Sequence, residues 1–149
     1  MGEIKNNSDY IFCAWRRKRV RLTPEEYVRQ NFLHRLVEEF HYPTSLIAVE
    51  VALTIPYTIH HAPYTIHPKR YRADAIVYSP DMRPLMLIEF KADTVPLTRQ
   101  VLDQIAVYNT LLGVPYLILH NGKQTVVAQV HDGQLSFLQS LPEWKQLSH

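Results

Sequence analysis

The chain contains 149 residues, of which 46% are hydrophobic, and 16 Lys and Arg against 14 Asp and Glu give it a net charge of +2. This length suits one domain with a sizeable core, and the lack of an apolar run near ~20 residues excludes a membrane-spanning helix. The polar N-terminus does not resemble a secretory signal. A single cysteine, Cys13, excludes an internal disulfide and fits a reducing cytosol, so a cytoplasmic location is expected.

Basic residues gather near the N-terminus, directly after the apolar stretch 10–15, which we expect to pack on the domain as an extended segment. A cluster of this kind can neutralise phosphates and gives salt-dependent binding. A solvated arm, or a basic strand paired with an acidic body, explains the pattern equally well. We expect residues 1–22 to form this basic arm, which contains Arg16, Arg17, Lys18, Arg19 and Arg21.

A helix is predicted to begin after Thr23. Thr23 suits the N-cap, Pro24 the first helical position, and Glu26 the last position of a capping box. Arg29 and Gln30 either approach a phosphate from the first turns or belong to a solvated helix face. The buried face is predicted from residues that recur at helical spacing: Val28, Phe32, Leu33, Leu36, Val37 and Phe40.

Residues 45–54 predict a strand with one acidic residue in it. Glu50 is surrounded in sequence by apolar residues, where a lone buried carboxylate is costly. Two explanations remain open: Glu50 is an additional metal ligand, or it pairs with an arginine such as Arg72. A regular pleat places four apolar residues together on one face of this strand: Ile47, Val49, Val51 and Leu53.

The segment Pro-Tyr-Thr-Ile-His occurs twice, at residues 56–60 and 63–67. This duplication is too short for a solenoid and is expected to form an extended hairpin arm. Its histidines lack the fourth ligand and the spacing of a zinc site. Contact with DNA is the better expectation for this arm, which contains His60, His61 and His67.

Two β-prone segments, residues 72–78 and 85–91, flank the turn-forming sequence Ser-Pro-Asp-Met-Arg-Pro. A hairpin symmetric about this turn places Asp74 opposite Glu89 and puts Lys91 on the same face. Two close carboxylates repel unless one is protonated or a cation lies between them, and Mg²⁺ suits oxygen ligands of this kind. A salt bridge of purely structural use, from either acid to Lys91, explains the same spacing.

The second half of the chain predicts a helix over residues 97–112, with Gly113 as its C-cap and with Gln104 and Tyr108 on one face. This helix is a crossover, which allows a parallel pair of strands inside a mixed sheet. The tail, residues 141–149, is expected to dock through Trp144. Short strands are predicted around the tight turn Asn121-Gly122, at residues 116–119, 125–130 and 135–138.

Several of these motifs occur together in a fixed order along the chain. They are residues 23–30, Arg72-Ala73-Asp74, Ile88-Glu89-Phe90-Lys91-Ala92, residues 104–109 and Asn121-Gly122. The set resembles the N-terminal nuclease domain of type I restriction enzyme R subunits, in a short stand-alone form. The resemblance covers residues 10–140 and implies a PD-(D/E)XK domain over residues 23–140. The fold it implies is α/β and restriction-endonuclease-like: an αβββαβ core with a central mixed sheet flanked by helices, and extra C-terminal strands.

The same resemblance implies roles for individual residues. Asp74, Glu89 and the backbone carbonyl of Phe90 would hold Mg²⁺ or Mn²⁺, and Lys91 would position the attacking water. The catalytic residues are then Asp74, Glu89 and Lys91. An acidic residue on the first helix often assists the metal in this superfamily, so Glu26 is either a further ligand or only a helix cap. The residues expected to contact DNA or brace the site are Arg29, Gln30, Arg72, Gln104 and Tyr108.

The expected function is Mg²⁺-dependent hydrolysis of DNA phosphodiester bonds by an endonuclease of a restriction-modification system. The alternative is a nuclease fold that has lost catalysis and serves in DNA binding or assembly. The sequence has no Gly-x-x-x-x-Gly-Lys-Ser/Thr loop, so no ATP site is expected on this chain. The expected partners are DNA, a second copy of the chain, and a separate motor or specificity subunit. No membrane partner is expected.

Overall fold

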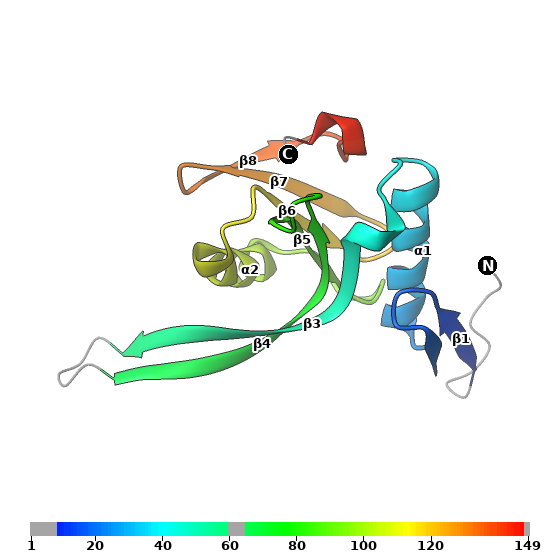
Figure 1. Ribbon diagram of the computed structural model, residues 1–149, viewed down its shortest axis with the longest axis horizontal. Coiled ribbons are helices and arrows are strands. Elements are labelled where there is room, and N and C mark those ends of the chain that lie inside the picture. The colour runs from blue at the N-terminus through cyan, green and yellow to red at the C-terminus, as the bar shows by residue number, and fades with distance from the viewer. Residues whose placement is uncertain (1–8, 60–64, 148–149) are drawn as a thin grey trace.

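A mixed β-sheet with one long arm forms the body of the protein in the computed structural model, which describes residues 9–59 and 65–147 (Figure 1). The helices are α1 (Pro24–Glu38) and α2 (Arg99–Leu112), and single 3-10 turns occur at Thr44–Leu46 and Trp144–Gln146. The strands are β1 (Tyr10–Cys13), β2 (Lys18–Arg21), β3 (Ile47–Ile59), β4 (Thr65–Tyr78), β5 (Pro84–Phe90), β6 (Tyr116–His120), β7 (Thr125–His131) and β8 (Gln134–Leu138).

The main sheet has the strand order β3-β4-β5-β6-β7-β8. Neighbouring strands are antiparallel except β5 and β6, which are parallel because α2 crosses over between them. The fold of the described residues is therefore α/β, with two α-helices, a six-stranded mixed sheet and a small separate hairpin. The predicted mixed sheet, crossover helix and extra C-terminal strands are confirmed.

The two helices cover opposite faces of the sheet. Along β5, side chains alternate between two hydrophobic clusters: Ile88 packs in the cluster that includes Phe32 of α1, and Leu87 packs in the cluster that includes Leu102 of α2. We call these the α1 cluster and the α2 cluster. β5 is thus buried on both faces, as expected for a strand between two helical layers.

The first turn of α1 forms only half of the predicted capping box. The Thr23 hydroxyl accepts a hydrogen bond from the N–H of Glu26 at 3.1 Å. The N–H of Thr23, however, donates to the carbonyl of Arg21, and the Glu26 carboxylate contacts Arg16 instead. The interpretation of Glu26 as a capping-box residue is wrong, because its charge is used in another contact.

The register of the β4–β5 hairpin is as predicted. Ala75 lies opposite Ile88 and Val77 opposite Met86, so the next pair along the same register is Asp74 and Glu89. The ladder shifts by one residue only beside the turn, after Val77. The symmetry of the turn therefore determines which residues meet at the far end of the hairpin.

Strand β3 changes faces in its middle. Val49 packs against the α1 cluster and Val51 against the α2 cluster, although residues two apart on a strand normally share a face. Glu50 causes the change, because its φ of 54° lies in the left-handed region and interrupts the pleat. The prediction of one shared face is therefore wrong for the set Ile47, Val49, Val51 and Leu53.

Strand β4 changes faces at the same level. Ala75 packs in the α1 cluster, whereas Ala73 and Tyr71 pack with the α2 cluster. Asp74 lies between them, at the position opposite Glu50 in the β3–β4 register. Beyond this point, side chains of β3 and β4 that a regular pleat would direct to the other face point toward α2 instead.

The β3–β4 hairpin continues as a long arm that projects from the body of the protein (Figure 1). Its strands pair from Ile47 opposite Val77 to Ile59 opposite Thr65. The predicted extended arm is confirmed. The prediction about its histidines concerns His60, His61 and the side chain of His67, which lie outside the described residues.

The ends of α2 follow the predicted signals in part. Gly113 caps the helix with a φ of 72°, a conformation in which a side chain is strained. At the other end the helix begins two residues later than predicted, because Thr98 supplies the N-cap hydroxyl. In the ranges that the structure describes, no helix is both long and apolar enough to cross a membrane.

The two terminal segments differ in how well they pack. β1 and β2 form a sheet of their own, in which Cys13 is buried but Tyr10 and Phe12 are 54% and 60% exposed. The prediction that residues 10–15 pack on the domain is therefore wrong for these two aromatic residues. At the other end, the Trp144 ring lies 5.6 Å from the Tyr42 ring, which confirms the predicted docking.

Candidate active site

Two carboxyl groups meet at the end of the β4–β5 ladder. Asp74 Oδ2 accepts a hydrogen bond from the N–H of Phe90 at 2.7 Å. The carboxyl groups of Asp74 and Glu89 lie close enough to affect each other's pKa. We call Asp74 and Glu89 the acid pair.

Burial raises the pKa of both members of the acid pair, and the charge of Asp74 adds to this effect at Glu89. Burial is the larger cause for Glu89, followed by the charge of Asp74, and together they raise its pKa to about 7. Burial also raises the pKa of Asp74. Because the two groups are in contact, they titrate as one system. A cation beside them would favour the ionised form of both groups.

Lys91 extends the acid pair toward solvent. Its Nζ lies 3.9 Å from Glu89 Oε1, and its side chain is 32% exposed. Its backbone N–H donates to the carbonyl of His120 at 3.0 Å, which fixes the chain just after β5. The ammonium group is therefore held beside the acid pair at a place that an anionic ligand can reach.

Two tyrosines hold Glu89 from the α2 side. The Tyr71 hydroxyl donates to Glu89 Oε2 at 2.9 Å, and the Tyr71 ring stacks on Tyr108 with centroids 3.8 Å apart. The structure thus brings the predicted Tyr108 to the site through Tyr71, whereas Gln104, one turn earlier, is exposed. Sequence reasoning misses Tyr71, because a regular strand would direct it away from Asp74.

Glu50 lies between two arginines. Its Oε1 is 2.5 Å from Arg29 Nη1, and its Oε2 is 3.5 Å from Arg72 Nη1. Burial opposes ionisation of Glu50, but the hydrogen bond and the charge of Arg29 lower its pKa below the usual value. Of the two explanations for this acid, the structure displays the arginine pair, with Arg29 as the closer partner and the expected Arg72 as the second.

Arg29 and Gln30 belong to a buried polar cluster. They are 4% and 0% exposed, so the prediction of a solvated helix face is wrong for both. Gln30 Nε2 donates to Glu26 Oε2 at 3.0 Å, and Arg16 Nη2 lies 2.5 Å from Glu26 Oε1. Arg29 Nε is 3.8 Å from the same carboxylate. This cluster braces α1 against the N-terminal hairpin and against Glu50.

The acidic residue of α1 whose pKa is affected by the charge of Asp74 is Glu25. Burial raises its pKa first, the charge of Asp74 raises it further, and Lys91 acts in the opposite direction. Sequence reasoning selects Glu26 for this place and misses Glu25. Adjacent helical residues point about 100° apart, and the sequence alone does not show which one faces the sheet.

The donor chemistry of the acid pair fits a hard divalent cation, which prefers carboxylate and carbonyl oxygens. In an extended strand the N–H and C=O of one residue point to the same neighbour, so the Phe90 carbonyl faces β4 as its N–H does. Among the side chains that the structure describes, no group of three or more from His, Cys, Asp or Glu is placed to hold a metal ion. A cation here would rely on two carboxylates, one carbonyl and water.

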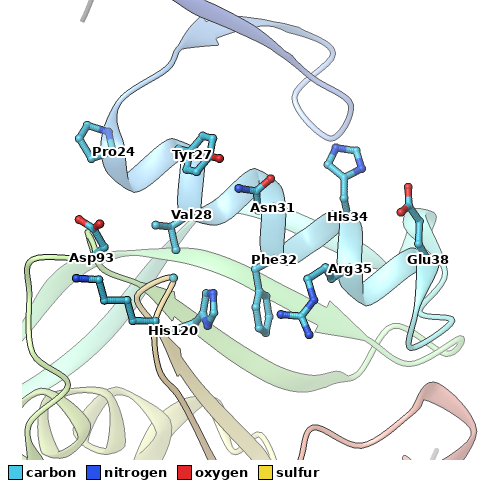
Figure 2. A pocket seen from close by; sticks show the side chains of 12 residues that line it. Pro24, Tyr27, Val28, Asn31, Phe32, His34, Arg35, Glu38, Asp93 and His120 are labelled. Carbon is cyan, nitrogen blue, oxygen red and sulfur yellow. The ribbon is translucent and has the colours of Figure 1, made fainter. Parts of the chain in front are cut away.

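A cavity of about 900 Å³ lies elsewhere, between α1 and the turn after β6 (Figure 2). Phe32 and Arg35 extend from α1 on the side where His120 lies, and Asp93 lies nearer Pro24 and Val28. Neither the acid pair nor Lys91 lines this cavity. Burial lowers the pKa of His120 to about 4, so its ring is neutral. The centroid of its ring lies 4.4 Å from that of the Phe32 ring, so it packs as a core residue.

The fold and the acid pair with its lysine define an α/β protein with a candidate ion site at the end of its central hairpin. A family model, "Type I restriction enzyme R protein N terminus", matches residues 24–142, and the chain belongs to this family. The resemblance inferred from the sequence motifs is confirmed.

A solved structure has the same fold. It is a fragment of a protein described as an HsdR subunit of a type I restriction enzyme from Vibrio vulnificus YJ016, with a TM-score of 0.61 and 18% sequence identity. The match covers 85% of this chain and 24% of that one, so the present chain spans about a quarter of its relative's length. A search of the curated proteins finds no match.

Replacing Glu89 by Gln should stabilise the protein at pH 8 in the absence of divalent metal, by about 2 kcal/mol. The pKa of Glu89 is about 7 in the folded protein against an ordinary value of 4.5, so the folded state binds the extra proton between these pH values. Stability of the unmodified protein therefore falls as pH rises from 4.5 to 7. Urea unfolding in EDTA at pH 4 and pH 8 measures the difference. An equal effect at both pH values would contradict the assigned pKa.

Replacing Arg29 by Gln should lower the free energy of unfolding by about 3 kcal/mol, because it leaves the carboxylates of Glu26 and Glu50 short of a buried partner. Arg35→Gln is the matched control: Arg35 is 54% exposed and pairs with exposed Glu39, so its loss should cost about 0.5 kcal/mol or less. Equal effects of the two variants in chemical denaturation would show that the buried cluster does not brace α1.

Proposed function

We propose that this chain hydrolyses DNA phosphodiester bonds with a divalent cation held by Asp74, Glu89 and the carbonyl of Phe90. The observation that carries the proposal is the contact between two carboxyl groups whose pKa values are raised, beside a lysine. Structural positions rarely keep such an unfavourable pair, whereas functional sites often do. Membership of the restriction R-subunit family supports DNA as the substrate.

Each residue of the site has a role in this proposal. A bound Mg²⁺ would polarise the phosphoryl group and lower the pKa of a coordinated water. Lys91 would orient the attacking water or hold a phosphate oxygen, since its ammonium lies 3.9 Å from Glu89 and reaches solvent. Tyr71 fixes the direction of Glu89 through its 2.9 Å hydrogen bond, and Tyr108 fixes Tyr71 by stacking. We interpret both tyrosines as positioning residues.

Of the two arginines that pair with Glu50, only Arg72 extends the proposed DNA contact. Arg72 is 69% exposed and pairs loosely with Glu50, so it can turn to a phosphate. Arg29, by contrast, is buried and supports Glu50 from behind. The proposal therefore assigns DNA contact to Arg72 and structural support to Arg29 and Gln30.

A second candidate function is a nuclease fold without catalysis, used for DNA binding or for assembly with other subunits. It is favoured by the absence, within the residues that the structure describes, of any metal-binding group of three side chains. The further acids Glu26 and Glu50 are already paired with Arg16 and Arg29. A response to metal separates the two candidates.

The wider partners follow from the family as proposals. The match covers only 24% of the relative of known structure, which is described as a subunit of a type I restriction enzyme. We propose that any motor or specificity function belongs to another chain or segment, and that a second copy of this chain supplies the second cut in a duplex. A restriction role of this kind would be cytoplasmic.

The proposal predicts that the protein nicks or linearises plasmid DNA in Mg²⁺ or Mn²⁺ and that Asp74→Asn and Lys91→Ala each lower the rate at least about 100-fold. Arg83→Gln is the control, because Arg83 is 65% exposed in the β4–β5 turn and pairs only with Asp81 among the contacts of the described chain. Equal cleavage by all three variants would mean that the activity belongs to another site or to a contaminant.

Mg²⁺ or Mn²⁺ should also raise the melting temperature without DNA, because a ligand that binds only the folded state stabilises it by about 2.7 kcal/mol at 100 times its dissociation constant. Glu89→Gln should abolish this shift, since it removes one of two carboxylate ligands. Differential scanning fluorimetry over a metal titration measures it. A shift of the same size in Glu89→Gln would place the ion elsewhere and favour the inactive module.

A further inference from the structure

The N-terminal hairpin presents a face on which aromatic and basic side chains alternate. Tyr10 lies opposite Arg21, and Phe12 lies opposite Arg19. Residues opposite each other or two apart on a hairpin share a face, so these four side chains lie together. Tyr10 and Phe12 are 54% and 60% exposed, and both arginines are exposed as well. We call these four residues the hairpin face.

The other side of the same hairpin already supplies the apolar residues that pack on the domain, so Tyr10 and Phe12 are not needed for that contact. Ile11 and Val20 form the next cross-strand pair and are half-buried, and Cys13 is fully buried. The hairpin therefore already has an apolar side that packs on the domain. Two large aromatic rings on its outer side need a separate reason.

We propose that the hairpin face binds a single-stranded segment of nucleic acid, with bases stacked on Tyr10 and Phe12 and phosphates on Arg19 and Arg21. Proteins that bind single strands combine exposed aromatic rings with a basic surface, because every base has a face that can stack. The Arg19 guanidinium lies 6.0 Å from the centre of the Tyr10 ring, so positive charge already accompanies the stacking surface.

Charge selects this partner over a second copy of the chain. Residues 10–21 contain five basic residues and no acidic one, and the nearest acid in sequence is Asp9. A symmetric dimer through this face would bring the same arginines of two copies together, which is repulsive. A polyanion with flat apolar groups matches both the charge and the rings.

The hairpin is attached close to the candidate active site. Arg16 lies in the turn between β1 and β2, and its Nη2 is 2.5 Å from Oε1 of Glu26 in α1. The hairpin lies beside the N-terminal half of this helix (Figure 1). From the next turn of the helix, Arg29 reaches Glu50, which faces Asp74 across the strands. This part of the inference rests on the proposed function: the bound strand would be the one that leaves the cleavage site.

Fluorescence polarisation with a labelled oligothymidine, in EDTA, tests the proposal on the full chain. Phe12→Ala and Tyr10→Ala should each weaken binding about tenfold or more, and Phe12→Leu should weaken it nearly as much because it lacks a ring to stack. Phe137→Ala is the matched control, because Phe137 is also 54% exposed but lies on β8. Melting temperatures of all variants should stay within a few degrees of the unmodified protein.

The basic half of the hairpin face has its own measurement. Arg19→Gln should reduce the slope of log affinity against log salt by about 0.7, the value for one phosphate contact on a single strand. Arg99→Gln, at a residue 70% exposed on α2, should leave the slope unchanged. Phe12→Leu should lower the affinity without changing the slope.

Two results would overturn the inference: binding of oligothymidine that is the same in the Phe12, Tyr10 and Phe137 variants, or hairpin variants that change the oligomeric state in light scattering instead of the affinity. The proposed function can fail separately. If the protein binds oligothymidine through the hairpin but cuts no DNA in metal, this inference stands without the nuclease. If the protein cuts DNA but the hairpin variants bind oligothymidine as the unmodified protein does, the nuclease proposal stands and this inference fails.

Discussion

The rest of the site depends on the contact between Asp74 and Glu89. Burial raises the pKa of both carboxyl groups, and the charge of Asp74 raises that of Glu89 further, so the folded protein favours either a proton or a cation there. Neighbouring groups are arranged around this requirement: Tyr71 donates to one oxygen of Glu89, the Phe90 N–H donates to Asp74, and Lys91 lies beside the other oxygen of Glu89. The hydrogen bonds fix the carboxylates, and the ammonium group only partly offsets their repulsion.

A second set of charges keeps the surrounding acids apart from this pair. Arg29 is buried under α1 and contacts Glu50, while Arg16 from the hairpin occupies Glu26. Buried arginines of this kind contribute little net stability but make the loss of either partner costly. The consequence is that Glu50 and Glu26 are each paired with an arginine, whereas burial and the charge of Asp74 raise the pKa values of Glu89 and of the nearby Glu25.

The sequence predicts the elements and the central register well, and the local geometry less well. Asp74 opposite Glu89 follows from the turn between the two strands, because a hairpin with a short turn has few possible registers. Tyr71 and Glu25 do not follow from it. Tyr71 reaches Glu89 only because the pleat changes at Glu50, and left-handed backbone at a glutamate has no signal in the sequence. The exposure of Tyr10 and Phe12 cannot be predicted from the sequence either, because large aromatic residues are normally expected in the core.

The change of face at Glu50 and the acid pair are two parts of one arrangement. A non-glycine residue in left-handed backbone costs about 1–3 kcal/mol and persists only where its surroundings hold it. Here the two salt bridges of Glu50 hold it, and the result is that Tyr71 and Tyr108 come to the acid pair. A regular strand would be more stable but would direct Tyr71 away from Glu89. The strain at Glu50 and the repulsion between Asp74 and Glu89 therefore lie within one small region, where stability is given up for the position of a few side chains.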